Sequence, residues 1–169
     1  MAILPILIYG APQLRQKARP VTVVDGAVQR LIDDMVETMY AAPGVGLAAN
    51  QVGVLQRIIV VNPTEKQDPE GLQAIINPEI VLAEGEVVAE EGCLSIPDVR
   101  EDVARFRRVV VRGIGRDEKP LEVEAAELAS RVLQHEIDHL DGVLFVDRLS
   151  PAKKTLLKRQ LKKRFLDTA

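Results

Sequence analysis

The feature that most constrains this chain is the segment His135-Glu136-Ile137-Asp138-His139, which holds the only two histidines of the 169 residues. The apolar residues around it recur at helical spacing, which predicts a helix. Side chains four residues apart leave the same face of a helix one turn apart, so both imidazoles can reach one metal ion. Glu136 lies beside that face, where it can move a proton instead of binding the ion. This is the H-E-x-x-H arrangement of zinc hydrolases; two surface histidines on a charged helix are the alternative.

A catalytic metal site needs a third protein ligand and an open position. The single cysteine, Cys93, lies in the segment EEGCLSIP (90–97) and can form no internal disulfide, which is typical of a reducing compartment. Its thiolate is the candidate third ligand, because soft sulfur binds late divalent metals well. A small buried core residue is the alternative interpretation of Cys93.

A third segment, GVGLAANQ (44–51), is rich in small residues, so another chain can lie close to its backbone. Position 49 is alanine, and no predicted strand precedes the segment, which excludes a dinucleotide-binding glycine loop. The alternative is a turn followed by a tightly packed helix start, with Gln51 as an ordinary polar residue.

The remaining pattern predicts an α+β fold, with mostly antiparallel strands around the central metal-binding helix, an N-terminal helix and a C-terminal helix. The first helix is expected to begin after the N-cap Asp25 and to end before Pro43. The central helix is expected over 124–140, and the last helix begins at Ser150-Pro151. Strands are predicted at 57–61, 72–77, 80–88 and 103–114, with one more short strand at 144–146.

Composition excludes several classes of protein. Apolar residues make up 47% of the chain and charged residues 28%, which is typical of a folded chain and not of a disordered one. No apolar run approaches the ~18 residues of a membrane span. The segment 1–8 is broken by Pro5 and has no basic residue, so it is a poor signal peptide and we expect a cytoplasmic location. With no Trp, two Tyr and three Phe, we expect no base-stacking recognition of nucleic acid and no sequence-specific nucleic-acid partner.

The charge is divided unevenly along the chain. Residues 151–169 hold seven basic residues and one acidic residue, a net charge of +6, whereas residues 1–150 carry a net charge of −9. Leu157, Leu161 and Phe165 recur every fourth residue, which predicts a helix with one apolar face and a cationic remainder. The charges either solvate the helix or attract a polyanion.

Taken together and in this order, the segments 44–51, 91–95 and 135–142 resemble the three signature motifs of the peptide deformylase family. The patterns G-x-G-x-A-A-x-Q, E-G-C-L-S and H-E-x-D-H-L-x-G are each met in full. The likeness runs from the N-terminal Ile-Leu segment to about Leu149, and the basic tail is similar to that of the Gram-negative-type bacterial branch. The resemblance implies a catalytic domain over 1–150, with 151–169 as a basic C-terminal helix of the same domain.

The resemblance also implies a function and a set of roles. The enzyme would be a metal-dependent hydrolase that removes the N-formyl group from the N-terminal formyl-methionine of newly made polypeptides and releases formate. Cys93, His135 and His139 would bind one divalent ion, and Glu136 would be the general base and acid. Gln51 and the backbone N–H of Leu94 would hold the oxyanion. The substrate, extended beside Gly46 with its methionine in a pocket, would be bound by Gly44, Val45, Gly46, Glu91, Leu94, Leu128 and Val132.

The implied cofactor is Fe²⁺ in the cell, and Zn²⁺, Ni²⁺ or Co²⁺ fit the same ligands in preparations. The implied partners are nascent formyl-methionyl peptides and, through the basic C-terminal helix, the ribosome; no membrane partner is expected.

Two other functions fit parts of the pattern. A zinc endopeptidase uses the same H-E-x-x-H, but its third ligand is typically a later His or Glu, and this chain has no third histidine. A non-catalytic metal-stabilised binding module would need Glu136 as a fourth ligand. Neither explains the segment 44–51.

Overall fold

The computed structural model describes residues 2–64 and 67–166. Met1 of the predicted N-terminal segment and residues 167–169 of the predicted basic tail lie outside the described residues. The fold is α+β, as predicted, with antiparallel sheets and helices at both ends of the chain. The α-helices are α1 (Gly26–Ala41), α2 (Glu127–Leu140) and α3 (Pro151–Leu161). The strands are β1 (Gly46–Ala48), β2 (Ile58–Val61), β3 (Gln73–Glu84), β4 (Val87–Cys93), β5 (Ile96–Arg105), β6 (Arg108–Ile114) and β7 (Pro120–Ala126).

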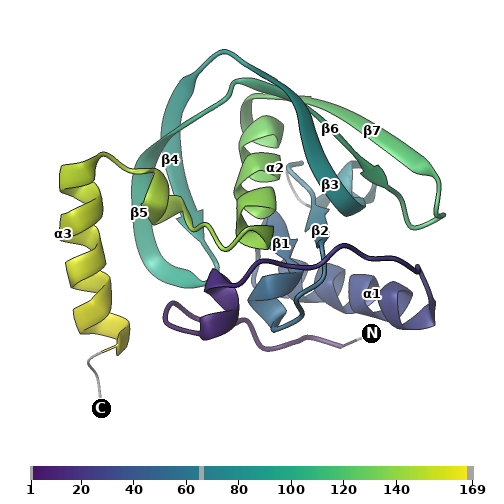
Figure 1. Cartoon of the computed structure of the whole chain (residues 1–169), viewed down its shortest axis with the longest axis horizontal. Coiled ribbons are helices and arrows are strands. Elements are labelled where there is room, and N and C mark those ends of the chain that lie inside the picture. Colours follow the sequence, from purple (N-terminus) through teal and green to yellow (C-terminus); the bar gives the residue numbers. More distant parts are fainter. Residues whose placement is uncertain (1, 65–66, 167–169) are drawn as a thin grey trace.

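Two antiparallel sheets hold the central helix between them. Five strands form one sheet in the order β1-β2-β3-β6-β7, and β4 and β5 form the other. Figure 1 shows α2 between the β4–β5 pair and the strands β3, β6 and β7. Val132, Leu133, Ile137 and Leu140 of α2 pack in one core cluster with apolar residues of the large sheet. The fold thereby fixes the helix that carries both histidines.

The first helix follows its sequence signals closely. The side chain of Asp25 accepts a hydrogen bond from the backbone N of Val28 at 3.0 Å, which makes it the N-cap. Val28, Ile32 and Met35 are buried in the cluster that contains β1 and β2 residues. The predicted start and end of this helix are confirmed.

One predicted break in the sheet is wrong. β3 runs without interruption through Asn77 and Pro78. Asn77 has a φ of +53°, and the pairing with β6 shifts register between Ile76 and Glu79. A β-bulge therefore accommodates the proline, which cannot donate to the ladder. The turn lies later, at Gly85-Glu86, so the predicted strand 80–88 spans the end of β3 and the start of β4.

Three further boundaries differ from the prediction. The strand expected over 103–114 is two strands, β5 and β6, separated at Phe106-Arg107. The central helix begins at Glu127, not at 124, because the preceding residues are β7, paired with β6. Residues 145–148 form a 3₁₀-helix and not a strand. Leu144, Phe145 and Val146 are buried, and a short buried apolar run has the same sequence pattern in a strand as in a helical turn.

The C-terminal helix lies against the β4–β5 side of the molecule (Figure 1). Leu157 and Leu161 are buried in a cluster with Ile96 and Phe145, and Phe165, in the π-helical turn Lys162–Leu166, packs at its edge. This confirms the apolar face. Ser150 occupies the N-cap position, although its side chain makes no capping hydrogen bond. None of the described helices has the length and apolarity that a bilayer crossing requires.

Candidate metal centre and active site

The helix α2 presents both histidines toward the segment that holds the cysteine. His135 is 8% exposed and His139 1%, and Cys93 ends strand β4 beside them. On the other faces of the helix Leu133, Ile137 and Leu140 anchor it in the core. The helix cannot rotate without exposing these side chains, so the direction of the imidazoles is fixed by packing.

Three donor atoms from distant parts of the sequence converge. Sγ of Cys93 lies 3.3 Å from Nε2 of His139, which in turn lies 3.2 Å from Nε2 of His135. All three atoms are within 4.8 Å of one another. A tetrahedral ion with bonds of about 2.1 Å to nitrogen and 2.3 Å to sulfur separates its ligands by about 3.4–3.6 Å. The donor set and its spacing therefore fit one divalent ion.

The second ring nitrogen of His135 is held by Glu91. Nδ1 of His135 lies 2.8 Å from Oε1 of Glu91. Arg105 donates to both oxygens of this carboxylate at 2.8 and 2.9 Å, and Arg131 donates to Oε2 at 2.6 Å. Burial alone would raise the pKa of Glu91, but the bonds from His135 and Arg105 outweigh it and lower this pKa to about 2. Glu91 is thus a fixed anion that orients a metal-ligand candidate, a role beyond the pocket lining implied for it.

The carboxylate of Glu136 is buried beside the donor atoms. Its Oε1 has no hydrogen-bond partner among the described residues. Burial, the largest influence, raises the pKa of Glu136 to about 7, with the charges of Glu91 and Asp138 adding to the rise and those of His135 and Arg105 opposing it. A buried carboxylate without a protein partner is expensive unless it serves an ion, water or substrate.

The two imidazoles are in different electrostatic states. Burial lowers the pKa of His139 well below its usual value, and the charge of His135 lowers it further. Burial also lowers the pKa of His135, but the charges and hydrogen bonds of Glu136, Cys93 and Glu91 outweigh it and raise that pKa. A neutral imidazole is the form that binds metals, which suits His139.

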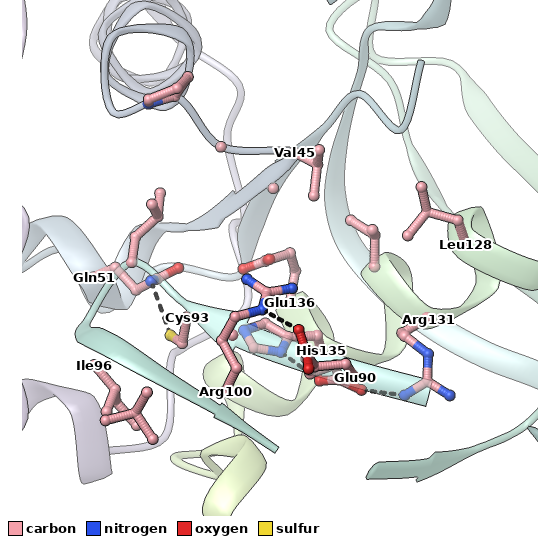
Figure 2. Close-up of a pocket in the computed structure, with 18 of the residues that line it drawn as sticks. Val45, Gln51, Glu90, Cys93, Ile96, Arg100, Leu128, Arg131, His135 and Glu136 are labelled. Atoms are coloured by element: carbon pink, nitrogen blue, oxygen red, sulfur yellow. Dashed lines mark hydrogen bonds and ion pairs between the residues drawn. The ribbon is translucent and has the colours of Figure 1, made fainter. Parts of the chain in front are cut away.

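Gln51 and Leu94 lie on the cysteine side of the site. Nε2 of Gln51 donates to Sγ of Cys93 at 3.7 Å and to Oγ of Ser95 at 3.1 Å, while its Oε1 accepts from the backbone N of Ala48 at 2.9 Å. Figure 2 shows Gln51 and Cys93 facing the same space as Glu136. The amide group is held in place and points an N–H toward the donor atoms.

A pocket of about 560 Å³ opens beside the donor atoms. Of the twelve site residues named from the sequence, eleven line it; the exception is His139, which is 1% exposed. A Cβ added at Gly46 would come within 2.5 Å of Oε2 of Glu136, and one at Gly44 within 2.8 Å of the Leu94 side chain. The small residues of the segment 44–51 therefore let β1 approach the site. The alternative of a turn that leads directly into a helix start is wrong for residues 46–48, which form the strand β1.

Sequence reasoning missed two buried arginines at this site. Arg131 lies four residues before His135 on α2, so helical spacing alone could have placed it on the same face. Arg105 reaches the site from the end of β5, and no local pattern signals that. It also donates to Asp138 at 2.6 Å, which extends the ion network around the helix.

Comparison with known proteins gives a consistent result. The family model described as "Polypeptide deformylase" matches residues 3–155. The peptide deformylase of Syntrophobacter fumaroxidans is 53% identical over 164 residues, covering 97% of this chain and 96% of that protein. The peptide deformylase of Thermodesulfovibrio yellowstonii is 49% identical over 162 residues, covering 96% and 98%.

Solved structures agree with these relatives. A crystal structure of a peptide deformylase from Legionella pneumophila superposes with a TM-score of 0.87 at 45% identity and covers 96% of this chain and 95% of its own. A peptide deformylase from Ehrlichia chaffeensis, solved in complex with actinonin, gives a TM-score of 0.89 at 36% identity, with coverages of 98% and 99%.

Proposed function

This chain belongs to the peptide deformylase family, and from that premise we propose how its residues divide the work of the reaction. The protein is a metal-dependent hydrolase that removes the formyl group from the N-terminal formyl-methionine of nascent peptides. The zinc endopeptidase alternative is not favoured, because neither the family model nor the relatives and structures described above point to one.

The observation that carries the proposal is the convergence of Cys93 Sγ and the two histidine Nε2 atoms beside Glu136, whose Oε1 has no hydrogen-bond partner in the described part of the chain. Cys93, His135 and His139 would hold the ion. Three ligands leave one position open, which a catalytic site needs and a closed structural site lacks. A divalent ion bound there supplies a Lewis acid that polarises a carbonyl oxygen and lowers the pKa of water.

Glu136 is the proton carrier in this proposal. It takes a proton from the attacking water and gives it to the amine that leaves, so that formate and a free N-terminal methionine are released. Its buried Oε1 without a described partner supports this role, because that atom is open to a reacting group. A non-catalytic module would use this carboxylate as a fourth ligand, so turnover distinguishes the two.

Gln51 and the backbone N–H of Leu94 would stabilise the oxyanion. The amide of Gln51 is oriented before substrate arrives, by its bonds to Ala48 and Ser95. A donor fixed in advance needs no reorganisation during the reaction, and each such donor contributes about 3 kcal/mol.

The substrate would bind in an extended conformation beside Gly46. β1 is an edge strand, paired on one side with β2, so its other side can accept a peptide strand. Val45 and Leu128 are exposed residues of the pocket lining, whereas Val132 and Glu91, which also line it, are buried. The methionine side chain would enter between them.

We propose Fe²⁺ as the ion in the cell, with Zn²⁺, Ni²⁺ or Co²⁺ in preparations. A thiolate with two imidazoles accepts any of these ions. The iron form should lose activity in air through oxidation of iron or of Cys93, whereas the zinc form should not. An iron form that stays fully active after long aerobic storage would contradict this assignment.

Residues 1–150 are proposed as the catalytic domain, with the helix over 151–169 as a part of it, in a cytoplasmic enzyme. The packing of Leu157 and Leu161 on the body supports one unit. Three tail cations already pair with acids of the body: Lys153 with Glu101, Lys158 with Asp147 and Arg164 with Asp98.

The other tail cations support docking on the ribosome. Among the described residues, no ion pair involves Lys154, Arg159, Lys162 or Lys163. Ribosomal RNA is a polyanion, so these cations give salt-sensitive attraction without base-specific contacts.

Truncation at Ser150 would expose the buried side chains of Ile96 and Phe145, so charge reversal is the cleaner test of docking. The double variant R159E/K163E should bind ribosomes more weakly and with a shallower salt dependence, and the exposed body variant K17E should not.

The function itself is tested with two peptides. Enzyme loaded with Fe, Ni or Zn without oxygen should release formate from formyl-Met-Ala-Ser and leave acetyl-Met-Ala-Ser intact. Cleavage of internal peptide bonds instead would support the endopeptidase, and tight metal binding without any turnover would support the binding module.

A further inference from the structure

Arg131 is an unexpected residue in the pocket that would take the methionine side chain. It lies on α2 one turn before His135, is 5% exposed and lines the pocket (Figure 2). The side chains around it that would contact a methionine are apolar, namely Val45, Leu128 and Val132. A guanidinium group in such surroundings must either be fully satisfied by the protein or serve a ligand.

The protein satisfies only part of this guanidinium. Nη1 donates to Oε2 of Glu91 at 2.6 Å and to the backbone O of Val103 at 2.8 Å, and Nη2 donates to the backbone O of Val87 at 2.8 Å. A guanidinium has five N–H groups, and these contacts use three of them. Among the described residues nothing accepts from Nε or from the second N–H of Nη2. The three bonds fix the plane of the group, so the remaining donors have a fixed direction.

A fixed donor that meets a bound side chain distinguishes side chains of equal shape. A hydrocarbon chain that fills the pocket displaces water from the guanidinium and offers no acceptor in return, which costs free energy. The thioether sulfur of methionine is a weak acceptor and offsets part of that cost. A site with a buried donor discriminates against the analogue that lacks the matching acceptor.

We propose that Arg131 is a specificity-determining residue, whose guanidinium recognises the sulfur of the first methionine of the substrate. This inference rests on the proposed function, because it concerns the same pocket and the same peptide. Shape and apolarity alone would let the pocket accept norleucine, which replaces the sulfur with a methylene group, as well as or better than methionine. With Arg131 in the pocket, methionine is favoured over norleucine.

The test compares formyl-Met-Ala-Ser with formyl-norleucyl-Ala-Ser on one metal-loaded preparation. The ratio of the two kcat/KM values does not depend on the fraction of active enzyme. Wild-type enzyme should favour methionine by about fivefold, the size expected of one weak hydrogen bond that is buried. The variant Arg131→Met, which removes the donors, should bring the ratio to one or below.

Arg105 provides the matched control. It binds the same Glu91 carboxylate with two hydrogen bonds but does not line the pocket. Arg105→Met should therefore keep the wild-type ratio even where its absolute activity falls. Arg112→Met removes an exposed arginine paired with Glu122, and it reports the effect of losing a charge elsewhere.

The outcomes separate the two levels of the proposal. If neither formyl peptide is deformylated, the proposed function fails. If both are deformylated by the wild-type enzyme with a ratio of one or below, the role of Arg131 is overturned, and this holds even if Arg131→Met does not fold. A methionine preference that survives in folded Arg131→Met would also overturn it.

Discussion

Nδ1 of His135 lies 2.8 Å from Oε1 of Glu91, and the same carboxylate accepts hydrogen bonds from Arg105 and Arg131. Strand β4 thereby orients an imidazole that belongs to α2. The contact leaves Nε2 of His135 free to face His139 and Cys93, 3.2 Å from the ring nitrogen of His139. One buried network of Glu91, Arg105 and Arg131 therefore holds the ring of His135 in place, and two of its members, Glu91 and Arg131, also line the pocket.

Glu91 links the ring of His135 to two buried arginines. Glu91→Gln removes the charge that orients His135 and that pairs with two buried arginines, so metal affinity should fall about 10- to 100-fold, and thermal stability should fall as well. Competition with a chelator measures the affinity. The neighbouring Glu90→Gln is the control, because Glu90 is 60% exposed and pairs with the exposed Arg100. Equal metal affinity in Glu91→Gln and wild type would contradict the role assigned to Glu91.

Glu136→Gln should keep the metal and lose the reaction. All three proposed ligands remain, but the amide cannot carry a proton, and general acid–base catalysis contributes about 10²–10⁴-fold. Metal content and formate release are measured on the same sample. A fully metallated variant that works at the wild-type rate would show that Glu136 is not the base.

Gly46→Ala tests the close approach of β1 to the site. The added Cβ would meet Oε2 of Glu136 at 2.5 Å, so the carboxylate must move. We expect turnover to fall by about 10²-fold, as when one catalytic group is misplaced, with metal binding retained. Gly26→Ala is the control, since its Cβ would meet only the flexible end of Arg30, at 3.2 Å. Unchanged turnover in Gly46→Ala would refute a positioned Glu136.

Sequence signals were sufficient to predict an element where the residues of that element alone determine its ends. Asp25 and Pro43 predicted the two ends of α1, and the His-x-x-x-His spacing placed both imidazoles on one face of α2. These signals failed where pairing with a distant strand determines the structure, as it does for β7, which pairs with β6. Leu121, Val123 and Ala125 alternate toward the core as β7, but the apolar helix that follows directly masked this alternation.

The ion network of the site could be predicted only in part. The spacing of Arg131 and His135 was available from the sequence, but nothing in it shows that Arg105, at the end of β5, meets Glu91, fourteen residues earlier on β4. That contact depends on the register of the β4–β5 hairpin, which in turn depends on a turn that the sequence did not reveal. Buried charge pairs between elements are therefore the least predictable part of this site.

Asp147 should stabilise the protein in a pH-dependent manner. Burial alone would raise its pKa, but hydrogen bonds from Arg15, the Leu144 N–H and Lys158 outweigh it and lower the pKa. A lowered folded-state pKa means that the stabilisation is present above the unfolded value of about 3.9 and is lost as the pH falls through the folded value. Asp147→Asn should therefore unfold at lower urea concentration than wild type at pH 7, and the gap should close toward pH 3. A gap of equal size at both pH values would contradict this.

The most direct measurement of the central claim is X-ray absorption at the metal edge of the protein loaded with iron without oxygen. Cys93, His135 and His139 as ligands predict one sulfur and two imidazole nitrogens around the ion, and Cys93→Ser should remove the sulfur signal and weaken metal binding, because a neutral hydroxyl replaces a thiolate. A wild-type spectrum with imidazole and oxygen ligands but no sulfur would contradict the metal centre described above.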